Sequence, residues 1–126
     1  FLLHIRPPPR SSLFPYPTLF RSFKISDIKR EFGSKVSDIV FAVTNEVGRN
    51  RVEKTLKTMH KVRSAGRDAT MVKLADRIAN TEFSYTQPGK HYLMYQREYP
   101  IFKWSLQRGD GIDRMWIKLH EVSTCL

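Results

Sequence analysis

The stretch MVKLADRIAN, residues 71–80, combines the apolar spacing of a helix with one line of polar side chains. Lys73, Asp76 and Asn80 are three and four residues apart, so they share one face of a helix. Both flanks of this line are apolar: Met71, Val72, Leu74, Ala75, Ile78 and Ala79. We therefore expect a packed helix whose Asp76 carboxylate needs a partner, because an isolated buried charge is costly. On spacing alone, an ion pair with Arg or Lys from another helix is favoured over a metal ion.

The rest of the chain from residue 27 onward reads as helices separated by short polar turns. Ser26 and Asp68 have side chains that commonly cap helix N-termini, and Asn50 or Arg51 opens another helix. Apolar residues recur with a period near 3.6, and no segment convincingly predicts a strand. The expected helices span residues 27–32, 34–44, 52–63, 69–84, 91–106 and 112–122. The predicted fold class is all-α.

Two of these helices carry specific packing expectations. The helix over 52–63 is expected to bury four apolar residues: Val52, Leu56, Met59 and Val62. Its basic residues are expected to be solvated. In the helix over 91–106, the aromatic residues are expected to serve as core or lid packing rather than as a stacking platform for bases: Tyr92, Tyr95, Tyr99, Phe102 and Trp104. Pro100 predicts a kink in this helix, or its division into two.

Three blocks of sequence carry a resemblance to a known family. They are a charged helix ending in EFG, then VSDIVFAVTNE, then VKLADRIAN about thirty residues later. In this order they resemble the second half of an HD-domain phosphohydrolase, and within that superfamily the RelA/SpoT-type hydrolases of guanosine tetra- and pentaphosphate. The resemblance covers about Ile25 to Leu119. It implies an all-helical HD-type bundle and a guanine nucleotide polyphosphate as substrate.

The resemblance also assigns roles to individual residues. Asp76 matches a ligand of a divalent metal ion, by resemblance Mn²⁺, which would polarise the phosphate and supply hydroxide from bound water. Asn80 matches a position that contacts the nucleotide, and Lys73 lies beside it. The other metal ligands implied by the family are a His and an adjacent His-Asp pair, expected before Phe23. None of the four histidines is followed by Asp: His4, His60, His91 and His120. The metal site is therefore incomplete, and this chain is expected to be inactive.

The first residues differ in character from the rest. Residues 6–22 read RPPPRSSLFPYPTLFRS, which resembles the translation of a common sequencing adapter. The alternatives are a proline-rich disordered arm or a targeting peptide, although the prolines break the helix that a transit peptide needs. We expect residues 1–22 to be a non-native, disordered segment, and residues 23–126 to be the C-terminal portion of one HD-type domain, an incomplete helical bundle. The apolar faces left uncovered would favour aggregation.

Composition leaves a second class of function open. A net charge of +10 and a pI near 10.1 are typical of proteins that bind nucleic acid, anionic lipid or polyphosphate. The basic residues are spread along the chain, however, which argues against nucleic acid. The alternative function is a non-enzymatic basic helical module that binds nucleic acid or a protein partner. A single cysteine, Cys125, and the lack of a long apolar run lead us to expect a soluble, cytoplasmic protein without a membrane partner.

Overall fold

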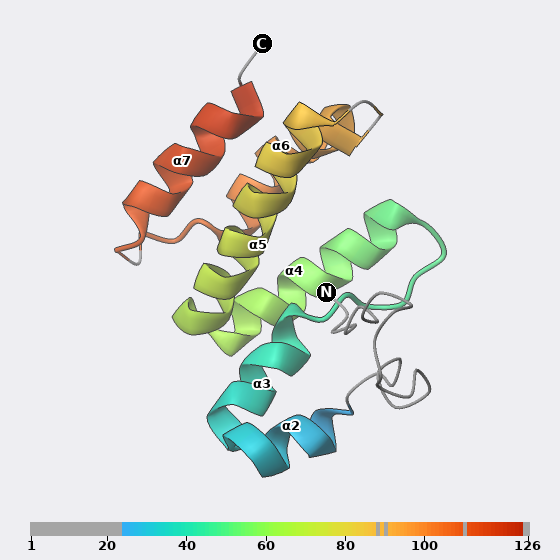
Figure 1. Ribbon diagram of the computed structural model, residues 1–126, viewed down its shortest axis with the longest axis vertical. Helices are drawn as coiled ribbons and strands as arrows, with labels where there is room; N and C mark the ends of the chain where they lie inside the picture. The colour runs from blue at the N-terminus through green and yellow to red at the C-terminus, as the bar shows by residue number, and fades with distance from the viewer. Residues whose placement is uncertain (1–23, 88, 90, 110, 125–126) are drawn as a thin grey trace, which may run out of the picture.

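The computed structural model describes residues 24–87, 89, 91–109 and 111–124, and within these ranges every regular element is an α-helix. The expected disorder of residues 1–22 and the single Cys125 lie outside the described residues. The helices are α2 (Ile25–Phe32), α3 (Ser34–Val43), α4 (Arg51–Ala65), α5 (Arg67–Thr86), α6 (His91–Leu106) and α7 (Asp113–Thr124) (Figure 1). The predicted all-α class is confirmed.

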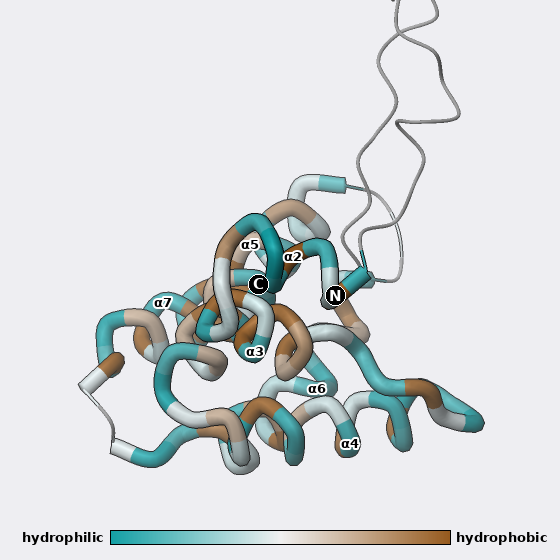
Figure 2. The backbone as a smooth tube through the Cα atoms, turned by 90° about the horizontal axis from the view of Figure 1, so that it is seen from below, coloured by the Kyte–Doolittle hydropathy of each residue, from teal (hydrophilic) through white to brown (hydrophobic). Residues whose placement is uncertain are grey.

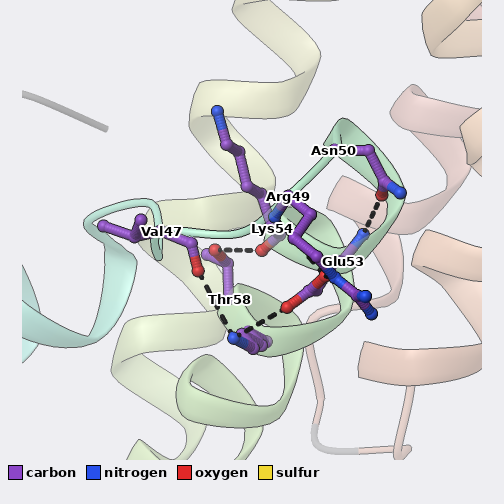
Figure 3. Close-up of polar contacts among 7 residues, drawn as sticks. Val47, Arg49, Asn50, Glu53, Lys54 and Thr58 are labelled. Carbon is purple, nitrogen blue, oxygen red and sulfur yellow. Dashed lines mark hydrogen bonds and ion pairs between the residues drawn. The ribbon is translucent and has the colours of Figure 1, made fainter.

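Helix boundaries follow local capping chemistry. The Asn50 side chain accepts a 2.9 Å hydrogen bond from the Glu53 backbone N–H and so caps α4, as the sequence predicted (Figure 3). The prediction of Ser26 as a cap was wrong, because α2 already begins at Ile25. Lys24 is its N-cap, and the Lys24 backbone N–H donates to Asp27 Oδ2 at 3.0 Å. An acidic side chain in the first turn therefore sets this boundary.

Helix α5, which contains residues 71–80, lies at the centre of the fold. It packs against α3, α4, α6 and α7, whereas α2, among the helices of the described residues, packs only against α3. In Figure 1, α7 runs alongside α5, and the α2–α3 pair lies below its lower end. Side chains on α5 can therefore meet groups from four other helices.

The core joins the facing sides of these helices. Its buried members are Ala42, Val43, Met59, Val62, Ala69, Leu74, Phe102, Leu106, Ile112, Trp116 and Leu119. The ring centroids of Phe102 and Trp116 are 5.9 Å apart, which joins α6 to α7. Two predicted core residues are exposed instead, Val52 at 66% and Leu56 at 45%, because α4 turns Thr58 rather than Leu56 inward.

Helix α6 runs through Pro100 without dividing, so of the two predicted alternatives, a kink or a division into two helices, the division did not occur. It is held against α7 by two hydrogen bonds to main-chain oxygens near the end of α7. The Tyr92 hydroxyl donates to the Val122 carbonyl at 2.8 Å, and Gln96 Nε2 donates to the Ser123 carbonyl at 3.0 Å. These bonds fix the orientation of α6, whose middle turns carry Tyr95 and Glu98.

Every helix in the described ranges carries both hydrophobic and hydrophilic residues. Figure 2 shows both colours on each helical segment, as expected for amphipathic helices packed around one core. None of the helices in the described ranges is long and apolar enough to cross a membrane.

Candidate functional site

The inward face of α5 is largely polar, which the sequence did not predict. Its buried polar residues are Thr70, Lys73, Arg77, Thr81 and Ser84. Hydroxyl groups on this face are satisfied within the helix; Thr81 Oγ1, for example, donates to the Arg77 carbonyl at 2.7 Å. The expectation that both apolar flanks of MVKLADRIAN are packed was wrong: Leu74 is fully buried, but Val72, Ala75 and Ala79 are exposed.

Lys73 is the most constrained charge on this face, with only 5% of its surface exposed. Its ammonium group donates to the Val43 carbonyl at 3.2 Å and to Asn45 Oδ1 at 2.9 Å. The Val43 carbonyl ends α3, where the helix dipole favours a cation. Burial lowers the pKa of Lys73 from 10.5 to about 8, although the Asp76 carboxylate opposes this shift. Burial therefore disfavours the protonated form of Lys73 relative to its form in water.

The loop between α3 and α4 is what places Asn45 opposite Lys73. The Glu46 backbone N–H donates to Thr58 Oγ1 at 2.9 Å. The Thr58 hydroxyl in turn donates to the Lys54 carbonyl at 2.7 Å (Figure 3). Thr58 is 1% exposed, so the loop is anchored in the core. The buried threonine therefore explains the inward turn of α4 noted above.

Arg77 is a second buried cation on α5, and it is paired. Its guanidinium donates to Glu98 Oε2 at 2.7 Å and lies 4.9 Å from the Tyr95 ring centroid and 4.7 Å from that of Phe102. Arg51 of α4 donates to both oxygens of the same Glu98 carboxylate. Burial alone would raise the pKa of Glu98, but the hydrogen bonds from Arg51 and Arg77 outweigh burial and lower it. Glu98 is therefore held as a carboxylate between two arginines.

Lys73, Asp76 and Asn80 line a single cavity of about 230 Å³, which we call the α5 pocket. The other lining residues are Asn45, Arg51, Lys54, Thr55, Thr58, Met59, Arg77 and Tyr95. The three residues singled out in the sequence thus lie together. Four cationic side chains surround one carboxylate, that of Asp76, so the pocket carries an excess of positive charge.

Asp76 does not form the ion pair that its spacing predicted. Within the described part of the chain it makes no hydrogen bond and no salt bridge, and its surface is half-buried. The Arg of the same LADR segment, Arg77, is the residue that forms the buried ion pair. No sequence signal indicated the ion pairs of Arg51 and Arg77 with Glu98, because pairings across 47 and 21 residues leave no local pattern.

The described lining of the α5 pocket does not by itself fit a divalent metal ion. Asp76 is its only carboxylate, and no histidine lines it. Nowhere in residues 24–87, 89, 91–109 and 111–124 do three or more His, Cys, Asp or Glu side chains form a group that could hold a metal. A divalent ion usually takes several such ligands. The donor set instead suits an anion, because Lys and Arg donate hydrogen bonds and accept none.

Comparison with known proteins gave no match: no protein-family model, curated protein or solved structure matches this chain.

Proposed function

We propose that the chain is part of an HD-type phosphohydrolase of the RelA/SpoT kind, and that the α5 pocket binds phosphate groups of guanosine tetra- or pentaphosphate or a related nucleotide. One observation carries the proposal: Lys73 and Asn80, the two residues matched to substrate binding, line one cavity with Arg51, Lys54 and Arg77. Arginine and lysine are the side chains that proteins use most to hold phosphates.

Charge and geometry support an anionic ligand in this pocket. At pH 7 Lys73 is protonated, because its pKa of about 8 lies above that pH. A phosphate placed near its ammonium would recover part of the electrostatic energy that burial removed, and would raise this pKa. Asn80 is exposed at the rim, so its amide can donate to and accept from the sugar or base.

In the proposed enzyme Asp76 is a ligand of a divalent metal ion, Mn²⁺ by resemblance. The described residues include no group of three or more potential metal ligands, and we propose that this chain binds the nucleotide without hydrolysing it. A cytoplasmic setting belongs to the same proposal, because the one cysteine offers no internal disulfide.

Isothermal titration calorimetry with guanosine tetraphosphate tests the proposal, using Lys54→Gln and, as a matched control, Lys29→Gln. Both lysines are exposed, but Lys29 lies on α2, away from the pocket. We expect the dissociation constant to rise roughly fivefold to tenfold for Lys54→Gln, because a charged donor to phosphate is lost. Lys29→Gln should leave it unchanged. Equal weakening by both changes, or no binding by the unaltered chain, would refute a phosphate site in the pocket.

The role of Asp76 is tested by repeating the titration with Asp76→Asn in EDTA and in Mn²⁺. Without metal, removing this carboxylate should strengthen binding severalfold, since it repels the phosphates. An Mn²⁺ ion carried by the nucleotide phosphates, which would supply the ligands that the pocket lacks, should make the unaltered chain bind more tightly than in EDTA, and Asp76→Asn should lose that gain. Asp38→Asn, an exposed acid on α3, is the control. If Mn²⁺ changes affinity equally in all three proteins, Asp76 is not a metal ligand.

A further inference from the structure

A second hollow lies on another part of the surface, where the last turns of α6 meet the end of α4 and the side of α7. We call it the Trp104 groove; its volume is about 800 Å³. Its lining residues are Arg63, Tyr99, Pro100, Lys103, Trp104, Gln107, Arg108 and His120. None of them lines the α5 pocket, so the two sites are separate.

Trp104 dominates this groove. It is 77% exposed, whereas the other tryptophan of the chain, Trp116, is 3% exposed and packed against Phe102. The sequence-based expectation that Trp104 packs into the core or a lid was therefore wrong in the described structure. An indole ring left so exposed forgoes the burial that usually stabilises tryptophan.

The wall beside Trp104 is rigid and aromatic. Tyr99 Oη and His120 Nδ1 are 2.9 Å apart, and their ring centroids are separated by 5.7 Å. Pro100 contributes a further apolar surface one helical turn from Trp104. These contacts hold the ring planes of the wall in place before any ligand binds.

The groove is also positively charged. Arg63, Lys103 and Arg108 line it, and none of its lining residues in the described ranges is an Asp or Glu. Across the described residues, neither Arg63 nor Lys103 has a hydrogen bond or ion pair to an acidic group. Arg108 is fixed at the end of α6, because it donates to the main-chain carbonyl of Trp104 at 3.2 Å and to that of Ser105 at 3.1 Å.

We propose that the Trp104 groove binds single-stranded nucleic acid, with a base stacked on the Trp104 indole and the adjacent phosphates held by Arg63 and Lys103. An exposed aromatic face within a basic groove is the combination by which single strands are bound without base-specific hydrogen bonds. A second copy of the chain fits less well, because two such basic surfaces would repel each other. An acidic peptide would neutralise the cations but has no need of a flat, exposed indole.

Fluorescence anisotropy with a fluorescein-labelled twelve-residue oligothymidylate tests this proposal on the full chain. We expect Trp104→Ala to weaken binding roughly 10-fold to 100-fold, the range for loss of one stacked base, and Trp104→Phe to retain most of the affinity. Ile117→Ala, an exposed apolar residue on α7, is the matched control and should have no effect. Circular dichroism checks that each variant is folded.

The charge contribution is tested by salt. Lys103→Gln should reduce the slope of log affinity against log salt concentration by about 1, whereas Lys29→Gln should not. Stacking on Trp104 should also appear as quenching of tryptophan emission by the oligonucleotide in the unaltered chain. This quenching should be absent in Trp104→Phe, whose remaining tryptophan, Trp116, is buried.

Three outcomes would overturn the proposal. The first is an affinity for the oligonucleotide that Trp104→Ala leaves unchanged, or that Lys29→Gln and Lys103→Gln weaken equally. In either case the chain would attract DNA only by diffuse charge. The second is an oligo-glutamate peptide that competes with the oligonucleotide at equal or lower concentration, which would assign the groove to an acidic peptide. The third is a Trp104-dependent dimer in sedimentation equilibrium that the oligonucleotide does not dissociate.

Discussion

Replacing Lys73 by methionine should remove most of the increase in the free energy of unfolding that this lysine causes between pH 7 and pH 10. The side chain is 5% exposed, and burial lowers its pKa to about 8 in the folded protein from 10.5 in the unfolded chain. Methionine keeps a similar length and cannot be protonated. Its cost is the loss of the hydrogen bonds to the Val43 carbonyl and to Asn45. Because Asn45 is exposed, water can replace the lysine there, whereas the buried Val43 carbonyl loses its donor.

The sign and the size follow from proton linkage. Below pH 8 Lys73 is protonated in both states, so the folded protein bears the full desolvation cost. As the pH rises from about 8 towards 10.5, the folded state releases its proton first, and the free energy of unfolding increases because the unfolded chain binds more protons. The two pKa values correspond to a gain of about 2.5 kcal/mol between pH 7 and pH 10.

Urea unfolding at a series of pH values measures this gain. The useful quantity is the free energy of unfolding of the unaltered chain minus that of Lys73→Met, because the titration of every other group cancels. We expect this difference to rise by about 2.5 kcal/mol from pH 7 to pH 10. Lys73→Gln should give the same result as Lys73→Met. For Lys29→Met, at an exposed site, the free energy of unfolding of the unaltered chain minus that of the variant should not change with pH. A Lys73→Met difference that stays constant within about 0.5 kcal/mol would refute a desolvated, protonated lysine at this position.

Two further changes test the surrounding structure. Arg77→Ala should lower the free energy of unfolding by about 3 kcal/mol, because it leaves the Glu98 carboxylate with one partner instead of two and empties the space between Tyr95 and Phe102. Arg51→Ala should lower it by less than about 1 kcal/mol, because the Arg51 side chain is 50% exposed. Equal losses in thermal unfolding would contradict this ranking. Asn50→Ala should cost about 1 kcal/mol through loss of the α4 cap, as measured by chemical denaturation, and a stability within error of the unaltered chain would show that the cap is dispensable.

The helices were largely predictable because their signals are local. The α4 cap at Asn50, the polar breaks after α3 and α5, and the turn before α7 all lie within a few residues of the boundaries that they set. The packing of individual residues was less predictable. Val52 and Leu56 have the spacing of an inward face, but the Glu46–Thr58 hydrogen bond belongs to a tertiary contact that turns α4 about its axis. Periodicity predicts that a helix has two faces and leaves their orientation to such contacts.

The candidate site was predictable where it depends on local spacing and unpredictable where it depends on tertiary contacts. Lys73, Asp76 and Asn80 share one helix face, so their common cavity followed from spacing. The partner of the buried charge did not. Asp76 was expected to form an ion pair with a basic residue of another helix. Instead its neighbour Arg77 forms an ion pair with Glu98 of α6. Only the relative placement of α4, α5 and α6 decides between these pairings.

In the described part of the chain, helix α2 packs against a single neighbouring helix, α3, and this has a consequence for how these helices unfold. A helix of eight residues has little stability of its own in water, so α2 depends on one seam of contacts, centred on Ile28. Detaching it leaves the core around α5 untouched. Opening of α2 should therefore precede global unfolding, and its amide hydrogens should exchange with solvent at a lower free-energy cost than those of α5. Within the described ranges the chain therefore has graded cooperativity, with α2 loosely coupled to a more stable group formed by the other five helices.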